Sequence, residues 1–274
     1  MIPASMAGSG ATAWSPFSSG KKRALDNGYR LYLPGKYVEE HPDEVFKKKT
    51  ELAVEILEDK LKAWDGRIPR NRVTLLMDAS YAVKRVLGPA REKGLIYVGR
   101  LKKDRRIRLF SRWMRVEYYF EAYRKERYFT SEGLMVFYKE AILEVKELGR
   151  VKVFRLKEEG EAEYKYYVTN KHKMTARTCY RYRKLRWKIE DMHRDVKQYL
   201  GLGNTCAWKK EPLLAHYSYV FYLWLLFERF RAEQELDVTF EALWWEYCTG
   251  VERAKMQRMQ LGEPPPIAAL FSYI

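Results

Sequence analysis

Cysteine is scarce in this chain of 274 residues. Only Cys179, Cys206 and Cys248 are present, and no two of them have the paired spacing of metal ligands or of a disulfide framework. The sequence therefore gives no support to a zinc ribbon or to a disulfide-stabilised secreted scaffold.

Long hydrophobic runs are also lacking. The most apolar segment, Leu213–Phe227, is 15 residues long and contains His216 and Ser218. A membrane-spanning helix needs roughly 20 apolar residues, so this run predicts a buried core helix and no membrane partner. The first residues contain no apolar core of a signal peptide, which together with the scarce cysteine predicts a cytoplasmic protein.

Positive charge and aromatic side chains are abundant instead. Lysine and arginine number 52 against 36 acids, which gives a formal net charge of +16, and aromatic residues make up 15% of the chain. Such a basic surface favours a polyanionic partner. Aromatic side chains among the arginines favour nucleic acid, because base stacking and phosphate pairing need both groups.

A strand–helix–strand pattern occupies the first part of the chain. Residues 45–64 have the apolar spacing of an amphipathic helix. Residues 73–78 then predict a buried strand that ends in Asp78, followed by a helix to about residue 93 and a strand over residues 95–101. An acid at the carboxyl end of a strand is where α/β sheets usually place sites.

The pattern changes twice further along. Residues 102–170 are charged, rich in tyrosine and strand-like, which predicts an antiparallel β-rich insertion. Residues 171–274 predict helices at about 175–200, 211–233 and 238–258. The predicted organisation is thus an α/β (α+β) chain in three parts: residues 1–101, 102–170 and 171–274.

The helix predicted around residues 180–200 carries the most informative charges. Residues 171–197 contain ten lysines and arginines and only three acids, of which Glu190 lies beside an apolar stripe. A glutamate among arginines is usually a salt-bridge partner. The sharper interpretation is a metal-binding carboxylate surrounded by cations that hold phosphates, as phosphodiester chemistry requires.

Arg186, Glu190 and Lys197 have the spacing of the arginine, glutamate and lysine in the Tyr-Arg-Glu-Lys signature of insertion-sequence DDE transposases, and the segments around them resemble that family. The strand ending in Asp78, with Ala79-Ser80-Tyr81 after it, is similar to the family's motif of an aspartate, small residues and an aromatic. The resemblance covers roughly residues 25–230.

This resemblance implies a ribonuclease H-like core, interrupted by a β-rich insertion, that cleaves and transfers DNA strands with divalent metal ions. Asp78 and Glu190 would be the catalytic and metal-binding acids, with Mg²⁺ or Mn²⁺ as cofactor if the site is intact. DNA would be the partner, with a possible homodimer on DNA ends. The expected DNA-binding residues are Tyr182, Arg183, Arg186, His193, Arg194 and Lys197. Trp113 and Trp187 are further candidates for base stacking, although packing in the core or on a sheet face is the more frequent role of tryptophan.

The chain departs from the family pattern at two places. The signature tyrosine belongs at position 183, where this sequence has Arg183, with Tyr182 one residue earlier. The family's first aspartate lies on an opening strand, and the first acid here is Asp26, which turn chemistry explains without a metal. We therefore expect a transposase that lacks its N-terminal part and its first catalytic acid.

Two other interpretations stay open. The chain could be a non-catalytic DNA-binding protein derived from a transposase, or a basic structural protein whose charged helix is only a solvated face.

Overall fold

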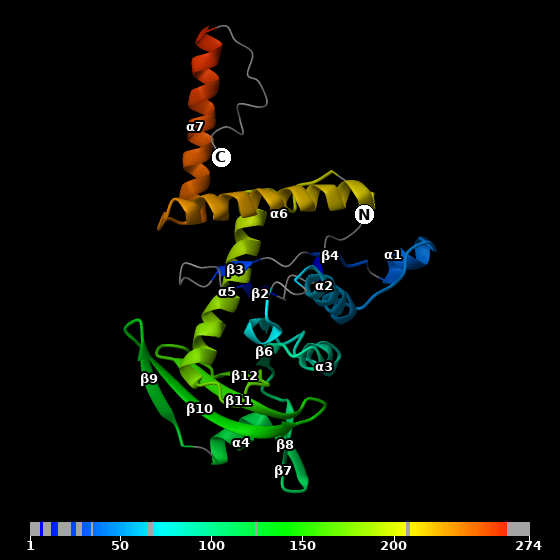
Figure 1. Cartoon of the computed structure of the whole chain (residues 1–274), viewed down its shortest axis with the longest axis vertical. Helices are drawn as coiled ribbons and strands as arrows, with labels where there is room; N and C mark the ends of the chain where they lie inside the picture. Colours follow the sequence, from blue (N-terminus) through cyan, green and yellow to red (C-terminus); the bar gives the residue numbers. More distant parts are fainter. Residues whose placement is uncertain are drawn as a thin grey trace. The chain divides into compact units, whose positions relative to one another are not determined.

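The computed structural model describes residues 6–7, 12–15, 23–25, 29–33, 35–64, 68–123, 125–206 and 209–261. By its internal contacts the chain divides into two compact units, residues 2–189 and residues 190–274. The first unit contains a sheet with helices on both faces, and the described residues of the second are mainly helical (Figure 1).

Ten strands in the described residues of the first unit form one sheet. They are β2 (Thr12–Ser15), β3 (Arg23–Leu25), β5 (Thr74–Met77), β6 (Ile96–Leu101), β7 (Arg106–Leu109), β8 (Arg112–Arg115), β9 (Arg127–Ser131), β10 (Leu134–Val145), β11 (Gly149–Glu158) and β12 (Lys165–Thr169). The order is β3-β2-β5-β6-β12-β11-β10-β7-β8, with β9 also paired to β10. A separate antiparallel pair joins β1 (Met6–Ala7) to β4 (Arg30–Leu31).

The predicted strand–helix–strand unit is present. Strands β5 and β6 run parallel, with α3 (Lys84–Glu92) between them along the chain. All four residues of β5 are buried because the sheet is covered on both faces at this point. The other strand pairings are antiparallel, so the sheet is mixed and the predicted α/β class is confirmed.

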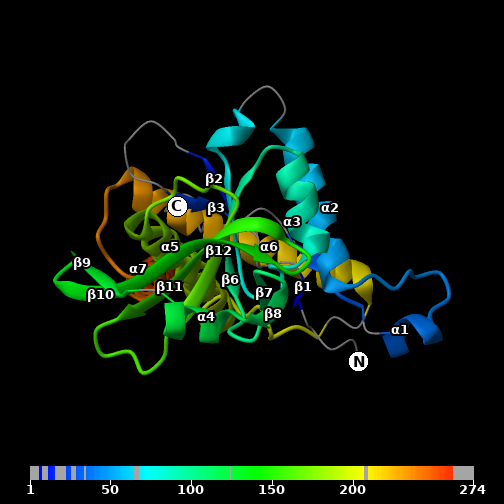
Figure 2. The same cartoon turned by 90° about the horizontal axis from the view of Figure 1, so that it is seen from below.

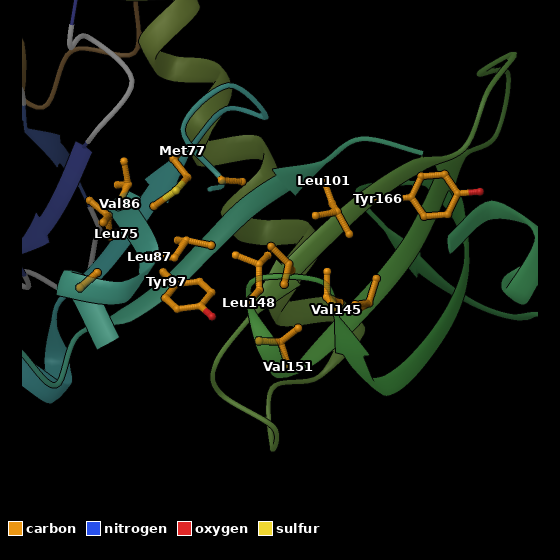
Figure 3. Close-up of a cluster of buried hydrophobic side chains, with 14 of the residues drawn as sticks. Leu75, Met77, Val86, Leu87, Tyr97, Leu101, Val145, Leu148, Val151 and Tyr166 are labelled. Carbon is orange, nitrogen blue, oxygen red and sulfur yellow. The ribbon is translucent and has the colours of Figure 1, made fainter. Parts of the chain in front are cut away.

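Helices α2 (Lys49–Ala63), α3 and α4 (Val116–Tyr123) supply buried residues to the core on one face of the sheet. Helices α2 and α3 lie side by side (Figure 2). Figure 3 shows how side chains from α3 meet those of β5, β6, β10, β11, β12 and the turn between β10 and β11 in this core: Leu75, Met77, Val86, Leu87, Tyr97, Leu101, Val145, Leu148, Val151 and Tyr166.

The opposite face of the sheet is covered by the first half of α5 (Ala176–Gln198). Leu76 of β5 and Phe154 of β11 pack there with Cys179 and Tyr180 of the helix. Burial raises the pKa of the Cys179 thiol, so this cysteine remains protonated in the core. The first unit therefore has three layers: helices, sheet, helix.

The β-rich segment is present as predicted. Strands β10, β11 and β12 follow one another along the chain in this segment and pair in the same order in the sheet. The same segment also contains α4, a helix that the strand-like pattern of residues 102–170 does not predict. Its buried Val116, Tyr119 and Phe120 have helical i, i+3, i+4 spacing.

The second unit contains the end of α5, α6 (Lys210–Glu233) and α7 (Phe240–Leu261). Phe227 of α6 makes edge contacts with Phe240, Trp244 and Tyr247 of α7. The prediction that Leu213–Phe227 is a buried helix was wrong in part, because Tyr219 and Tyr222 lie on an exposed face of α6. No helix in the described part of the chain combines the length and hydropathy of a membrane span.

Two short helices complete the described structure, α1 (Gly35–Glu40) and the 3₁₀ helix η1 (Arg70–Arg72), which immediately precedes β5.

Candidate active site

Asp78 lies directly after β5, at the carboxyl end of the parallel β5–β6 pair. Its carbonyl oxygen accepts hydrogen bonds from the backbone N–H groups of Tyr81 and Ala82, at 3.1 and 3.2 Å. This turn fixes the backbone of Asp78, while its side chain remains 45% exposed. The structure thus presents a carboxylate to solvent from a rigid strand end.

Side chains alternate along β5, so Thr74, Leu76 and Asp78 share the face that α5 covers. Two side chains of α5, one helical turn apart, reach this strand. The Thr74 hydroxyl donates to the Tyr182 hydroxyl at 3.2 Å, and Nη1 of Arg186 lies 4.0 Å from Oδ1 of Asp78. The helix is therefore attached to β5 at both ends of the strand.

The Arg186 guanidinium is almost fully buried, with 10% of its side chain exposed, whereas the Asp78 carboxylate is half exposed. A buried cation beside an accessible carboxylate places positive charge where an incoming phosphate would meet the strand end. Of the predicted site residues, Asp78 and Arg186 are the two that the first unit brings together.

Arg183 has a different environment from the one expected for a DNA contact. Its Nη2 lies 2.9 Å from Glu158 and 2.6 Å from Glu161, and only 12% of its side chain is exposed. Burial raises the pKa of Glu161, but hydrogen bonds from the Glu158 backbone, Lys165 and Arg183 outweigh it and lower that pKa to about 2. Arg183 thus takes part in an ion-pair network at the end of β11, and its predicted DNA contact stays a prediction.

The remaining predicted residues lie on the second half of α5. Glu190, Arg194 and Lys197 are exposed, and they follow one another at the i, i+4, i+7 spacing of one helix face. Arg194 pairs with Asp191 at 3.1 Å.

His193 lies on the same stretch and is half-buried. Burial lowers its pKa, the Lys197 ammonium lowers it further, and Glu190 opposes these effects. This histidine is therefore neutral at pH 7, and any contact that it makes with DNA would not depend on a positive charge.

Neither candidate tryptophan lies in the hydrophobic core. Trp187 on α5 is 53% exposed, and Trp113 on β8 is 42% exposed. Of the two expected packing roles, packing in the core is therefore wrong for both residues, and packing on a sheet face stays a prediction. The missed signal for Trp113 is its alternation with Arg112 and Met114 in a strand at the sheet edge, where one face is open to solvent.

The metal-binding capacity of the site is limited in the part of the chain that the structure describes. Carboxylates such as Asp78 and Glu190 are suitable oxygen ligands for Mg²⁺ or Mn²⁺. Strand β2, which pairs with β5, contributes no acid, and the described residues contain no group of three or more His, Cys, Asp or Glu side chains that could hold a metal. Asp26 lies outside the described residues.

Residues 50–216, more than half of the chain, match the family profile described as "Transposase DDE domain". The matched segment contains the strand that ends in Asp78, the β-rich segment and all of α5. No curated protein matched the chain. The DDE domain has a ribonuclease H-like fold, which agrees with the mixed sheet and its covering helices.

Proposed function

We propose, from the premise that the chain belongs to the family of transposases with a DDE domain, that Asp78 and Glu190 are acids of a site for DNA strand cleavage and transfer. The observation that carries the proposal is the exposed Asp78 carboxylate at the carboxyl end of β5, with the buried Arg186 guanidinium beside it. Nearly half of the Asp78 side chain therefore stays open to an incoming phosphate or metal ion.

Arg186 is a positioning residue in this proposal. Its guanidinium lies beside the Asp78 carboxylate and places positive charge where a phosphate oxygen would meet the strand end. The Tyr182–Thr74 hydrogen bond fixes the helix one turn earlier, so the guanidinium is delivered from a rigid element.

Glu190 follows Arg186 by one turn of the same helix, and Arg194 and Lys197 continue that face. We assign to these two cations, and to His193, contacts with the DNA backbone on either side of the cleaved phosphate. Two copies of the chain that each hold a DNA end in this way would form a homodimer on the DNA.

Asp78 and Glu190 would hold Mg²⁺ or Mn²⁺, which, when bound, supplies Lewis acidity at the reacting phosphate. The chain's own groups are responsible for orientation and charge: the carboxylates provide oxygen ligands, and the arginines and lysine hold the strands.

A second candidate function is DNA binding without cleavage. It is favoured by the lack of any three-acid cluster among the described residues and of an acid on β2 beside β5. Under this function the basic surface would bind DNA, and Asp78 would have no catalytic role.

The two functions differ in their response to Asp78→Asn, which keeps the shape of the side chain and removes its charge. We expect Mn²⁺-dependent nicking of DNA to fall at least about a hundredfold, because removing a charged group at a reacting centre costs about 3 kcal/mol or more. DNA affinity should stay the same or rise slightly, because a negative charge near phosphate is lost. Nicking and affinity should be measured on the same protein preparation.

Asp43→Asn is the matched control, because Asp43 is an exposed aspartate in the loop before α2. It should leave both readouts unchanged. DNA binding without metal-dependent nicking in the unaltered chain, and no effect of Asp78→Asn, would establish the non-catalytic function instead.

A further inference from the structure

The β7–β8 hairpin forms one edge of the sheet and extends beyond the neighbouring strands (Figure 1). Its sequence, RIRLFSRWMR, places an arginine at four of ten positions. Ile107 is fully buried against the core beneath α4, opposite Met114. The alternation of a strand therefore turns the neighbouring residues to the opposite, solvent-facing side.

That solvent-facing side concentrates positive charge. Arg106 lies directly opposite Arg115, and Arg108 lies directly opposite Trp113. Like charges at directly opposed positions destabilise a strand pair. Arg106 and Arg115 therefore destabilise the hairpin that carries them.

Neighbouring acids neutralise this charge only weakly. Arg108 lies 3.8 Å from Glu144, and Arg115 lies 3.4 Å from Glu117, with both arginine side chains about half exposed. Exposed pairs of this kind contribute little to stability. Among the described residues Arg106 has no ion pair, so these arginines are not explained by the stability of the fold.

The tip of the hairpin has an unfavourable backbone conformation and an exposed apolar side chain. Phe110 is 90% exposed, and its backbone has φ of 54°, in the left-handed region. A bulky side chain rarely adopts this conformation, and glycine or asparagine is the usual residue at such a turn. Conformations of this kind are unfavourable for a non-glycine residue and cluster at functional sites.

We propose that the β7–β8 hairpin is a DNA-contacting arm, in which Arg106, Arg108 and Arg115 bind phosphates and Phe110 inserts between bases of the duplex. A two-stranded ribbon has the width to enter a DNA groove. Apolar side chains such as phenylalanine serve as wedges between base steps, and exposed arginines pair with the backbone around them. The inference rests on the proposed function in one respect, namely that DNA is the partner.

Trp113 reinforces this assignment. Its indole stands beside Arg108 on the same open face, and Arg115 lies over the Tyr118 ring at 5.7 Å. Aromatic rings interleaved with guanidinium groups provide stacking surfaces together with phosphate ligands. An arm of this composition complements a polyanion with planar bases, and an acidic protein would need only the charge.

The charge part of the inference is tested by the salt dependence of DNA binding. Replacement of Arg106, Arg108 and Arg115 with alanine should reduce the slope of log affinity against log salt by about 2–3, since each phosphate contact contributes about 0.9. The matched control removes three other arginines that lie on α3 and α6, two of which form exposed ion pairs: Arg85, Arg91 and Arg229. The control should change the slope by well under 1, and equal changes in the two triple variants would overturn the inference.

The wedge is tested with duplex DNA that contains 2-aminopurine, whose fluorescence reports base stacking. Phe110→Ala should remove the fluorescence change on binding and weaken binding about tenfold, since stacking one base on an aromatic contributes a five- to hundredfold factor, roughly. Phe110→Gly should do the same while relieving the backbone conformation, so lost binding cannot be attributed to misfolding. Tyr222→Ala, at an exposed aromatic on α6, should change neither signal.

Several outcomes separate this inference from the proposed function. If the unaltered chain binds and nicks DNA but the hairpin variants behave like their controls, only the arm is wrong. If Phe110→Ala leaves DNA binding intact and instead reduces the mass of the particle in solution, the tip contacts another copy of the chain, which also overturns the arm. If the unaltered chain does not bind DNA, both proposals fail.

Discussion

The first half of α5 holds a mostly buried arginine between two acids, whereas the second half holds a buried aspartate near two further acids. Arg183 pairs with Glu158 and Glu161 in the sheet unit. Asp195, 9% exposed, lies near Asp191 and Glu228 in the helical unit, and the neighbouring Arg194 and Arg231 are closer to those other acids.

The pKa values of Glu161 and Asp195 consequently shift in opposite directions. The pKa of Glu161 falls to about 2 because hydrogen bonds and the Arg183 charge outweigh its burial. Burial raises the pKa of Asp195 to about 6, because Arg194 and Arg231 only partly offset burial and the charges of Asp191 and Glu228. One helix therefore contacts a balanced charge cluster, in which the ionised acid is favoured, and an unbalanced one, in which it is disfavoured.

The largest expected effect comes from removing the cation of the balanced cluster. Arg183→Met should lower the free energy of unfolding of the sheet unit by about 3 kcal/mol, because it leaves two partly buried glutamates without their arginine. Amide hydrogen exchange of β11 and β12 peptides would measure this loss in the correct unit.

The control for this variant is Arg229→Met. Arg229 forms an exposed ion pair with Glu233, and its loss should leave the free energy of unfolding nearly unchanged. Equal losses of unfolding free energy in the two variants would mean that burial of the Arg183 network does not contribute to stability.

The sequence predicted the elements that carry these clusters better than the pairings within them. The apolar run over residues 73–77 predicted β5 and the position of Asp78 at its end, and the stripe through Ile189 and Val196 predicted α5. These patterns are local, since the period of a buried face is written in consecutive residues.

The partners of Arg183 could not be predicted in the same way. Glu158 and Glu161 lie more than twenty residues earlier, on and after β11, and only the register of the sheet brings them beneath α5. The exposure of Phe110 could not be predicted from the sequence either. An apolar residue within RIRLFSRWMR is typical of a strand, and the turn lacks the glycine that would have indicated its position. The sequence pattern therefore predicted the helices and strands, whereas the contacts that determine the charge balance depend on the three-dimensional structure.

A smaller effect is expected when the acid of the balanced cluster is neutralised. The folded pKa of Glu161 lies below its ordinary value of 4.5, so the charged form stabilises the fold above about pH 4.5 and this contribution is lost as the pH falls toward 2. Glu161→Gln should therefore cost about 2 kcal/mol at pH 7. The cost should shrink as the pH is lowered through this window.

Urea unfolding at a series of pH values, with exchange of β12 amides as the local probe, would measure the difference. Glu235→Gln, in the exposed turn after α6, is the matched control and should give a flat difference. A cost for Glu161→Gln that does not depend on pH would show that its hydrogen bonds stabilise the fold without its charge.

The smallest effect, and one of opposite sign, is expected from Asp195→Asn. The folded pKa of Asp195 lies above its ordinary value of 3.8, so the folded state retains a proton that the unfolded state releases between about pH 4 and pH 6. The wild-type helical unit therefore loses stability as the pH rises through this window, and the neutral asparagine does not. At pH 8 the variant should be more stable by about 1 kcal/mol, and below pH 4 the difference should vanish. Exchange of α6 amides would follow the unit, with Asp237→Asn, at an exposed position before α7, as the control. A variant that is less stable than wild type at pH 8 would mean that Arg194 and Arg231 balance Asp195 after all, and the two halves of α5 would then be alike.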